Sequence, residues 1–148
     1  MDIALRLAGR ADAEPLAGLM AAYYRHDRLD FDPGRAGAAA QALMDDPRLG
    51  ELWAIETGGQ MIGYLALTFG FSLECGGRDA FVDELFVREE FRGQGVGTRA
   101  IRHALARCAA QGIRSLRIEA ARHNPRAVAL YRRLGFAEHE RHLMTLAL

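Results

Sequence analysis

The chain has 148 residues and a formal net charge of zero, because 19 arginines balance 19 acidic residues and no lysine is present. Its residues are 50% apolar and 26% charged, which excludes a disordered chain and fits one globular domain over residues 1–148. Without a basic surplus the chain lacks a general attraction to phosphate backbones, so nucleic acid is not expected as a partner.

Targeting and redox features are absent from the sequence pattern. Residues 1–15 include Asp2 and Arg6 and contain no continuous apolar run of secretory length. No stretch reaches the roughly eighteen apolar residues of a membrane span. Cys75 and Cys108 form no CxxC or metal-knuckle spacing. We therefore expect a cytoplasmic protein with reduced thiols, no metal site and no membrane contact.

The N-terminal part predicts one strand and two helices. Residues 2–8 alternate between apolar and polar as in a strand. Residues 11–27 have an acidic first turn and apolar positions at helical spacing. After a break at Pro33, residues 36–46 predict a second helix.

The middle of the chain predicts the main sheet. Two strand-like runs, residues 51–56 and 60–71, flank Gly58 and Gly59, and such a pair predicts a tight hairpin. Residues 78–88 predict a further long strand.

The last third alternates helices with strands. A helix is expected over residues 95–112, followed by a short strand over 115–121. Residues 124–135 predict a helix with Asn124 as N-cap, and residues 136–148 a final strand. The order β-α-α-β-β-β-α-β-α-β predicts an α/β (α+β) fold with a mixed sheet covered by helices.

Three glycines in five positions, Gly93, Gly95 and Gly97, precede the third helix. They permit positive φ and close approach of a ligand, and the N–H groups of a helix start suit an anion such as a diphosphate. The chain lacks the lysine of a P-loop, and the third glycine comes one position early for a dinucleotide fingerprint. A glycine-rich turn without a ligand remains the alternative.

Two motifs together resemble the GNAT superfamily of acyl-CoA-dependent N-acetyltransferases. The pattern R/Q-x-x-G-x-G/A is matched by Arg92, Gly95 and Gly97. The pattern N-x-x-A-x-x-L-Y-x-x-x-G-F is matched by Asn124, Ala127, Leu130, Tyr131, Gly135 and Phe136. The resemblance implies a GNAT-like fold, with a mostly antiparallel mixed sheet of six to seven strands flanked by about four helices.

The resemblance also implies acetyl-CoA as co-substrate. Backbone amides of the glycine turn would hold its pyrophosphate, pantetheine would lie along the preceding strand, and Arg92 would add a charge-assisted bond. Asn124 is expected mainly as an N-cap. The expected cofactor-binding residues are Phe86, Val87, Arg92, Gly93, Gln94, Gly95, Val96, Gly97, Thr98 and Asn124.

Tyr131 matches the family position whose phenol protonates the departing thiolate. A phenol with an ordinary pKa of about 10 stays protonated at neutral pH, whereas a thiol has a pKa of about 8.5. The alternative is that Tyr131 only packs its helix against the sheet.

Asp83 and Glu84 are the candidate bases that deprotonate the amine. Because side chains alternate along a strand, only one of them is expected to face the site. Glu84 occupies the acidic-L-x-V position and is the first choice, with Asp83 second. Either carboxylate could instead bind the substrate cation or form a salt bridge.

The expected acceptor is a small-molecule cationic amine. Glu74 and Asp79 add acidity to the hairpin tip over residues 69–81, and Tyr23, Tyr24 and His26 end the first helix near the acceptor side. A polar turn and core packing are the alternatives for these two groups. A protein N-terminal or lysine acetyltransferase and a non-catalytic acyl-CoA-binding domain remain alternative functions.

Only thirteen residues follow Gly135, whereas many GNAT relatives end with two strands. Either the terminal hairpin is very tight or one long strand replaces both strands. A single strand would leave a sheet edge for a partner subunit, so a homodimer is expected.

Overall fold

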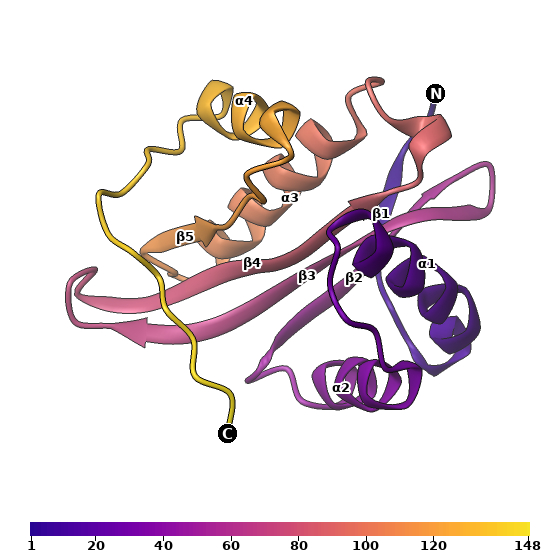
Figure 1. Ribbon diagram of the computed structural model, residues 1–148, viewed down its shortest axis with the longest axis horizontal. Coiled ribbons are helices and arrows are strands. Elements are labelled where there is room, and N and C mark those ends of the chain that lie inside the picture. The colour runs from indigo at the N-terminus through magenta and orange to yellow at the C-terminus, as the bar shows by residue number, and fades with distance from the viewer.

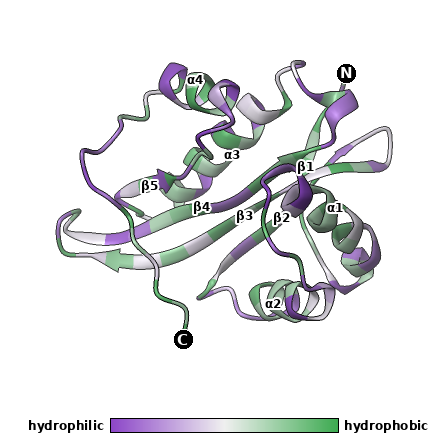
Figure 2. Ribbon diagram, viewed as in Figure 1, coloured by the Kyte–Doolittle hydropathy of each residue, from purple (hydrophilic) through white to green (hydrophobic).

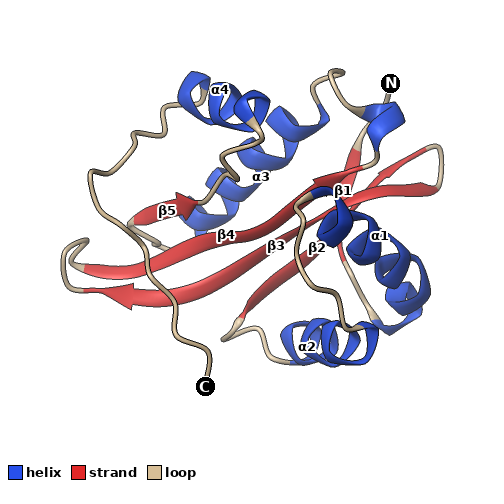
Figure 3. Ribbon diagram, in the orientation of Figure 1, coloured by secondary structure: helices blue, strands red, loops and turns tan.

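The computed structural model describes all 148 residues as a five-stranded mixed sheet with helices on both faces (Figures 1 and 3). The strands are β1 (Ala4–Leu7), β2 (Gly50–Thr57), β3 (Gln60–Ser72), β4 (Gly77–Val87) and β5 (Ser115–Ile118). The helices are α1 (Ala13–His26), α2 (Pro33–Asp45), α3 (Val96–Ala110) and α4 (Pro125–Arg133). Strands follow chain order across the sheet, and only β4 and β5 pair in parallel.

Helices cover both faces of the sheet. α1 and α2 lie on one side of the strands and α3 on the other, with α4 next to α3 (Figure 1). Figure 2 shows hydrophobic residues along much of the central strands. The first core joins α1 and α2 to β3 and β4 and includes Leu16, Leu19, Ala40, Tyr64 and Phe86. The second joins α3 to the opposite face and includes Ile101, Ala104, Leu65, Leu67 and Val82.

Local capping explains two helix starts. Asp32 Oδ1 accepts a hydrogen bond from the Arg35 N–H at 3.1 Å, so α2 begins at Pro33 and not at residue 36 as expected. Proline suits the first helical position because it needs no hydrogen-bonded N–H. Asn124 caps α4 in the same way, with its Oδ1 3.2 Å from the Ala127 N–H.

Asp12 is the buried charge that ties β1 to the start of α1. It is 7% exposed and accepts two hydrogen bonds of 2.8 Å from the Arg6 guanidinium and one of 2.8 Å from the Gly9 N–H. The hydrogen bonds from Arg6 lower the pKa of the Asp12 carboxyl to about 2.

A β-bulge interrupts β4 at Asp83. Leu67 pairs with Val82, but its neighbour Ala66 pairs with Glu84, so Asp83 is an extra residue. In a regular strand, two residues that are two positions apart share a face of the sheet. Because of the bulge, Val82 instead packs against α3 while Glu84 faces α1.

β4 and β5 diverge at the middle of β4. Their pairing runs only from Asp79 with Ser115 to Val82 with Ile118. β4 then continues to Val87 without a neighbour on that side. The second half of β4 thus has an open backbone edge.

The expected final strand over residues 136–148 is wrong, and the sheet has five strands instead of six or seven. Residues 137–148, here called the tail, follow α4 as irregular, fully exposed chain. An ion pair between Arg141 and Glu74, 2.8 Å long, joins the tail to the β3–β4 hairpin tip. No helix in the structure has the length and apolarity to cross a membrane.

Candidate active site

The turn from β4 to α3 presents a row of unpaired backbone N–H groups. Gly93 and Gly95 have φ of 73° and 83°, and Gly95 is the N-cap of α3. None of the N–H groups of residues 93–98 donates to an acceptor in the protein. A Cβ added at Gly95 would meet no atom within 4 Å, so the space before the turn is open. This row, here called the amide cradle, can hold a pyrophosphate.

Gly97 belongs to the same turn but also serves helix packing. A Cβ at this position would lie 3.1 Å from Leu130 Cδ2 of α4. The missing side chain lets α4 approach the start of α3, which brings the helix that carries Tyr131 next to the amide cradle.

Two guanidinium groups flank the cradle. Arg92 Nε donates to the Val87 carbonyl at 2.8 Å, and the guanidinium carbon lies 5.4 Å from the centre of the Phe86 ring. Its terminal N–H groups remain free. Arg126 Nη2 lies 3.3 Å from the position of a Cβ on Gly93. Sequence reasoning missed Arg126, whose only signal is its place in the first turn of α4.

An open groove of about 560 Å³ lies beside the cradle, between α1 and the turn after β4. Arg25, Arg88 and Arg92 contribute positive charge to it, and Glu89 and Glu90 negative charge.

Of Phe86 and Val87, whose backbones were expected to bind pantetheine, only Val87 faces the open edge of β4. Phe86 O would lie 2.3 Å from a Cβ on Gly63, and the Arg88 N–H donates to Ile62 O, so these main-chain groups face β3. The main-chain N–H and C=O groups of successive residues in a strand point to opposite edges. Those of Leu85 and Val87 therefore point to the open side of β4. The Val87 carbonyl already accepts from Arg92. Leu85, which sequence reasoning missed, thus replaces Phe86 as an edge residue.

Glu84 is held by two tyrosines. Tyr24 OH donates to its Oε1 and Tyr64 OH to its Oε2, each at 2.8 Å. Burial raises the pKa of the Glu84 carboxyl, the two hydrogen bonds oppose that rise, and the charges of Asp83 and Asp27 add to it. The result is a partly buried carboxylate whose raised pKa makes it a stronger base than a carboxylate in water.

Asp83 lies on the bulge with an exposed side chain and without a hydrogen-bond partner. Surrounding protein atoms still raise the pKa of its carboxyl by partial desolvation. Its charge contributes to the raised pKa values of Tyr23, Tyr24 and Glu84. The bulge interrupts the regular alternation of side chains, on which the expectation that only one of the two carboxylates faces the site depends.

Tyr131 projects from α4 with a half-buried ring that meets the Phe136 ring edge-on at 5.9 Å. Its hydroxyl has no hydrogen-bond partner in the protein and is not fully buried. Burial, and next the charge of Asp27, raise the pKa of Tyr131 to about 12. The phenol is therefore protonated at neutral pH and free to donate to a ligand.

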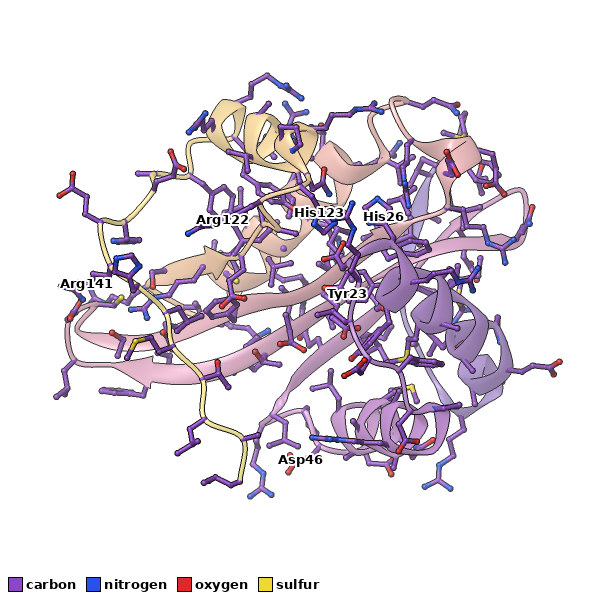
Figure 4. All side chains as sticks on the ribbon, in the orientation of Figure 1. Tyr23, His26, Asp46, Arg122, His123 and Arg141 are labelled. Carbon is purple, nitrogen blue, oxygen red and sulfur yellow. The ribbon has the colours of Figure 1, made fainter.

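The end of α1 meets the loop before α4. His123 Nε2 lies 3.2 Å from the His26 carbonyl, and His26 Nδ1 lies 2.9 Å from Asp27 Oδ1. Figure 4 shows His26 and His123 next to each other, with Tyr23 one turn earlier in α1. The charge of Asp27 contributes to the raised pKa values of both Glu84 and Tyr131.

Comparison with known proteins identifies the family. Residues 16–136 match the model of the Acetyltransferase (GNAT) family. The chain belongs to this family.

Two solved structures share the fold of this chain. An integron cassette protein from the mobile metagenome of Cole Harbour Salt Marsh is 36% identical and superposes with a TM-score of 0.86, over 97% of this chain and 90% of that one. An aminoglycoside N-acetyltransferase in complex with CoA superposes with a TM-score of 0.83 over 99% of this chain and 95% of that one. At 17% identity it shows the shared fold alone.

A curated relative matches a shorter region. The thialysine N-epsilon-acetyltransferase of Bos taurus is 32% identical over 75 residues, which is 51% of this chain and 44% of that protein. The match therefore spans less than half of the relative's length.

The remaining expected residues of this GNAT protein have local roles. The Val96 side chain is 2% exposed, so only its N–H can reach a ligand. The Gln94 amide donates to Glu90 O at 2.9 Å, and Asn124 is used as a cap. Thr98 contributes its free N–H to the cradle.

The acidic hairpin tip is neutralised. Glu74 pairs with Arg141 at 2.8 Å, and Asp79 lies 3.8 Å from Arg117. Three carboxylates without an arginine partner instead lie toward the end of α1: Asp27, Asp83 and Glu84. Asp27 and Tyr64 had no sequence signal, since neither belongs to a motif. No group of three or more His, Cys, Asp or Glu side chains is arranged to hold a metal ion.

Proposed function

We propose that this GNAT protein transfers the acetyl group of acetyl-CoA to the primary amine of a small cationic molecule, by direct attack with Tyr131 as general acid. The observation that carries the proposal is the amide cradle of residues 93–98 beside α4. Leu130 packs against Gly97 there, and the next residue, Tyr131, has a hydroxyl without a protein partner.

The chain's residues fit acetyl-CoA. Six consecutive N–H groups without acceptors, and open space before Gly95, suit a pyrophosphate. Arg92 and Arg126 would neutralise its charge. Leu85 and Val87 would present main-chain groups to the pantetheine amides along the open edge of β4. Acetyl-CoA supplies a thioester that an amine can attack.

Proton transfers are assigned to two residues. Glu84 takes the first proton from the ammonium, and Asp83 is the alternative base. The neutral nitrogen attacks the carbonyl carbon, the C–S bond breaks, and Tyr131 donates its proton to sulfur. The nitrogen loses its second proton as the amide forms, and one proton restores Tyr131. One proton is released per acetyl group transferred.

A cationic acceptor is favoured by the charges near Glu84. Asp27, Asp83 and Glu84 have no arginine partner, so a substrate ammonium would supply the missing countercharge. Relatives named for thialysine and aminoglycoside acetylation support a small amine.

The test is thiol release from acetyl-CoA by the purified protein. The acceptor panel holds polyamines, aminoglycosides, amino acids, aryl amines and peptides with lysine or a free N-terminus, and product mass confirms each hit. We expect turnover with one class of small amine. Turnover with peptides alone would indicate a protein acetyltransferase. Heat stabilisation by acetyl-CoA without turnover would indicate a binding domain.

A further inference from the structure

A second pocket, here called the loop pocket, lies between the end of α1, the connection to α2 and the first turns of α2. Figure 1 shows α1, α2 and their connection on one face of the sheet. The volume of about 400 Å³ is within the range of roughly 300 to 1,000 Å³ that is typical of small-ligand sites. The pocket shares no residue with the groove beside the cradle. Its lining residues are Tyr24, Asp30, Phe31, Asp32, Arg35, Ala36 and Ala39.

Part of the loop pocket is aromatic. The Tyr24 and Phe31 rings are inclined at 54°, with their centres 5.2 Å apart. The α2 residues Ala36 and Ala39 carry only a methyl group each, which leaves space in the pocket. Such a lining suits the methylene chain of a ligand, and the faces of the two rings also attract a cation.

The loop pocket also carries unpaired charges of both signs. Arg35, Asp30 and Asp32 line it together, yet the Arg35 guanidinium forms no ion pair or hydrogen bond with either carboxylate. The Asp32 side chain instead accepts from the Arg35 backbone N–H and caps α2. Asp30 has no partner either. A guanidinium and a carboxylate that line one pocket without pairing can each take a group of opposite charge from a ligand.

Tyr24 connects the loop pocket to the proposed base. Its side chain lines the pocket, and its hydroxyl donates to Glu84 Oε1 at 2.8 Å. Glu84 therefore lies no farther from the pocket than the length of a tyrosine side chain and one hydrogen bond. A ligand anchored in the pocket can reach Glu84 with a short chain, and the amine at the end of that chain is the one placed to react.

We infer that the acceptor is a diamino carboxylic acid, whose carboxylate binds Arg35 and whose distal amine lies at Glu84 and receives the acetyl group. This assignment rests on the proposed acetyl transfer and narrows its acceptor to one class of small amine. Asp30 binds the α-ammonium, and the methylene groups lie against the Tyr24 and Phe31 rings. With two ammonium groups and one carboxylate, the acceptor still carries a net positive charge.

Arg35 is the residue that separates this acceptor from other amines. A polyamine or an aminoglycoside in the loop pocket would place an ammonium group near an unpaired guanidinium, and like charges repel each other. A lysine within a peptide has no free α-carboxylate for Arg35, because its carboxyl group is in an amide bond. A free carboxylate matches the guanidinium in charge and in the geometry of two parallel hydrogen bonds.

The experiment measures thiol release from acetyl-CoA with matched pairs of acceptors. Lysine, ornithine and diaminobutyrate are each compared with the diamine of the same chain that lacks the carboxylate. We expect kcat/KM to be at least about tenfold higher for one of the amino acids than for its diamine, because a hydrogen-bonded charge pair contributes roughly 10- to 100-fold. Fragmentation of the product in a mass spectrometer should locate the acetyl group on the distal nitrogen.

The variant Arg35→Gln tests the assigned residue. It should lower kcat/KM for the amino acid roughly 10- to 100-fold, mainly through KM, and leave the diamine unchanged. The backbone N–H that caps α2 is retained, so thermal unfolding should match wild type. Arg102→Gln is the matched control, because Arg102 is an exposed arginine on α3, on the opposite face of the sheet, and forms no ion pair. It should change neither substrate.

The outcomes distinguish this inference from the acetyl-transfer proposal. Turnover with equal kcat/KM for amino acid and diamine, equal losses with both in Arg35→Gln, or acetylation of the α-nitrogen would overturn the inference and leave acetyl transfer standing. If no amine is acetylated, lysine is titrated calorimetrically into protein saturated with CoA. Binding that Arg35→Gln abolishes would then support the pocket assignment without the transfer, and absence of binding would overturn it.

Discussion

Replacing Tyr131 by phenylalanine tests the proposed chemistry most directly. The change removes one hydroxyl and keeps the ring that packs against Phe136. The hydroxyl has no hydrogen-bond partner in the protein, so no polar group loses its partner. We therefore expect the free energy of unfolding to change by less than about 0.5 kcal/mol.

The expected loss of activity is much larger. A general acid contributes roughly 100- to 10,000-fold to a rate, which corresponds to about 3 to 5 kcal/mol of transition-state stabilisation. Because the phenol contacts the substrate sulfur and not the pyrophosphate, acetyl-CoA affinity should remain within about twofold of wild type.

The assay combines thiol release at saturating amine with calorimetric titration of acetyl-CoA. Tyr23→Phe is the matched control, because Tyr23 OH also has no protein partner and lies on α1. A Tyr131→Phe variant with full turnover across the pH range would refute the assignment of the acid. Equal losses in both tyrosine variants would point to packing instead of proton transfer.

Three further predictions concern other parts of the structure. Glu84→Gln should lower turnover near neutral pH, and the loss should shrink as pH rises because the free amine then forms in solution; a pH profile of kcat that parallels wild type would contradict the role of Glu84 as base. Gly95→Val should weaken acetyl-CoA binding more than it affects folding, because the valine Cβ enters the open space before the cradle. Valine at the φ of 83° also costs about 1 kcal/mol of stability. Calorimetric titration measures the first effect and thermal unfolding the second. Asp12→Asn should cost about 2 kcal/mol of stability at neutral pH. The folded-state pKa of Asp12, about 2, lies below its ordinary value of 3.8, so this stabilisation is present above about pH 4 and is lost as pH falls toward 2. Thermal unfolding as a function of pH should show this acid dependence in wild type and not in the variant.

Turns and helix caps that depend only on residues close in the sequence were predicted correctly. The Gly58-Gly59 turn, the N-cap at Asn124 and the glycine turn all occur at the expected positions. In each case the signal is a backbone preference or a hydrogen bond within a few residues. The prediction of a final strand over 136–148 was wrong: strand formation requires pairing with another strand, and the tail pairs with none.

The details of the candidate site required the tertiary structure. Asp83 becomes a bulge residue only through the register of β4 on β3, which places Glu84 on the α1 side. The same register turns Leu85 and not Phe86 toward the open edge. No periodicity in a single strand reveals a bulge, because its pairing partner decides it.

The sequence by itself determined where glycine conformations and free helix N–H groups come together, because these are properties of a few consecutive residues. It also determined Tyr131 and Glu84 as candidates through motifs. Only the tertiary structure decided the environment of these groups. Tyr64 and Tyr24 meet Glu84 from 20 and 60 residues away, and such contacts between distant segments, which set the pKa of a carboxyl, exist only after the sheet and helices have packed.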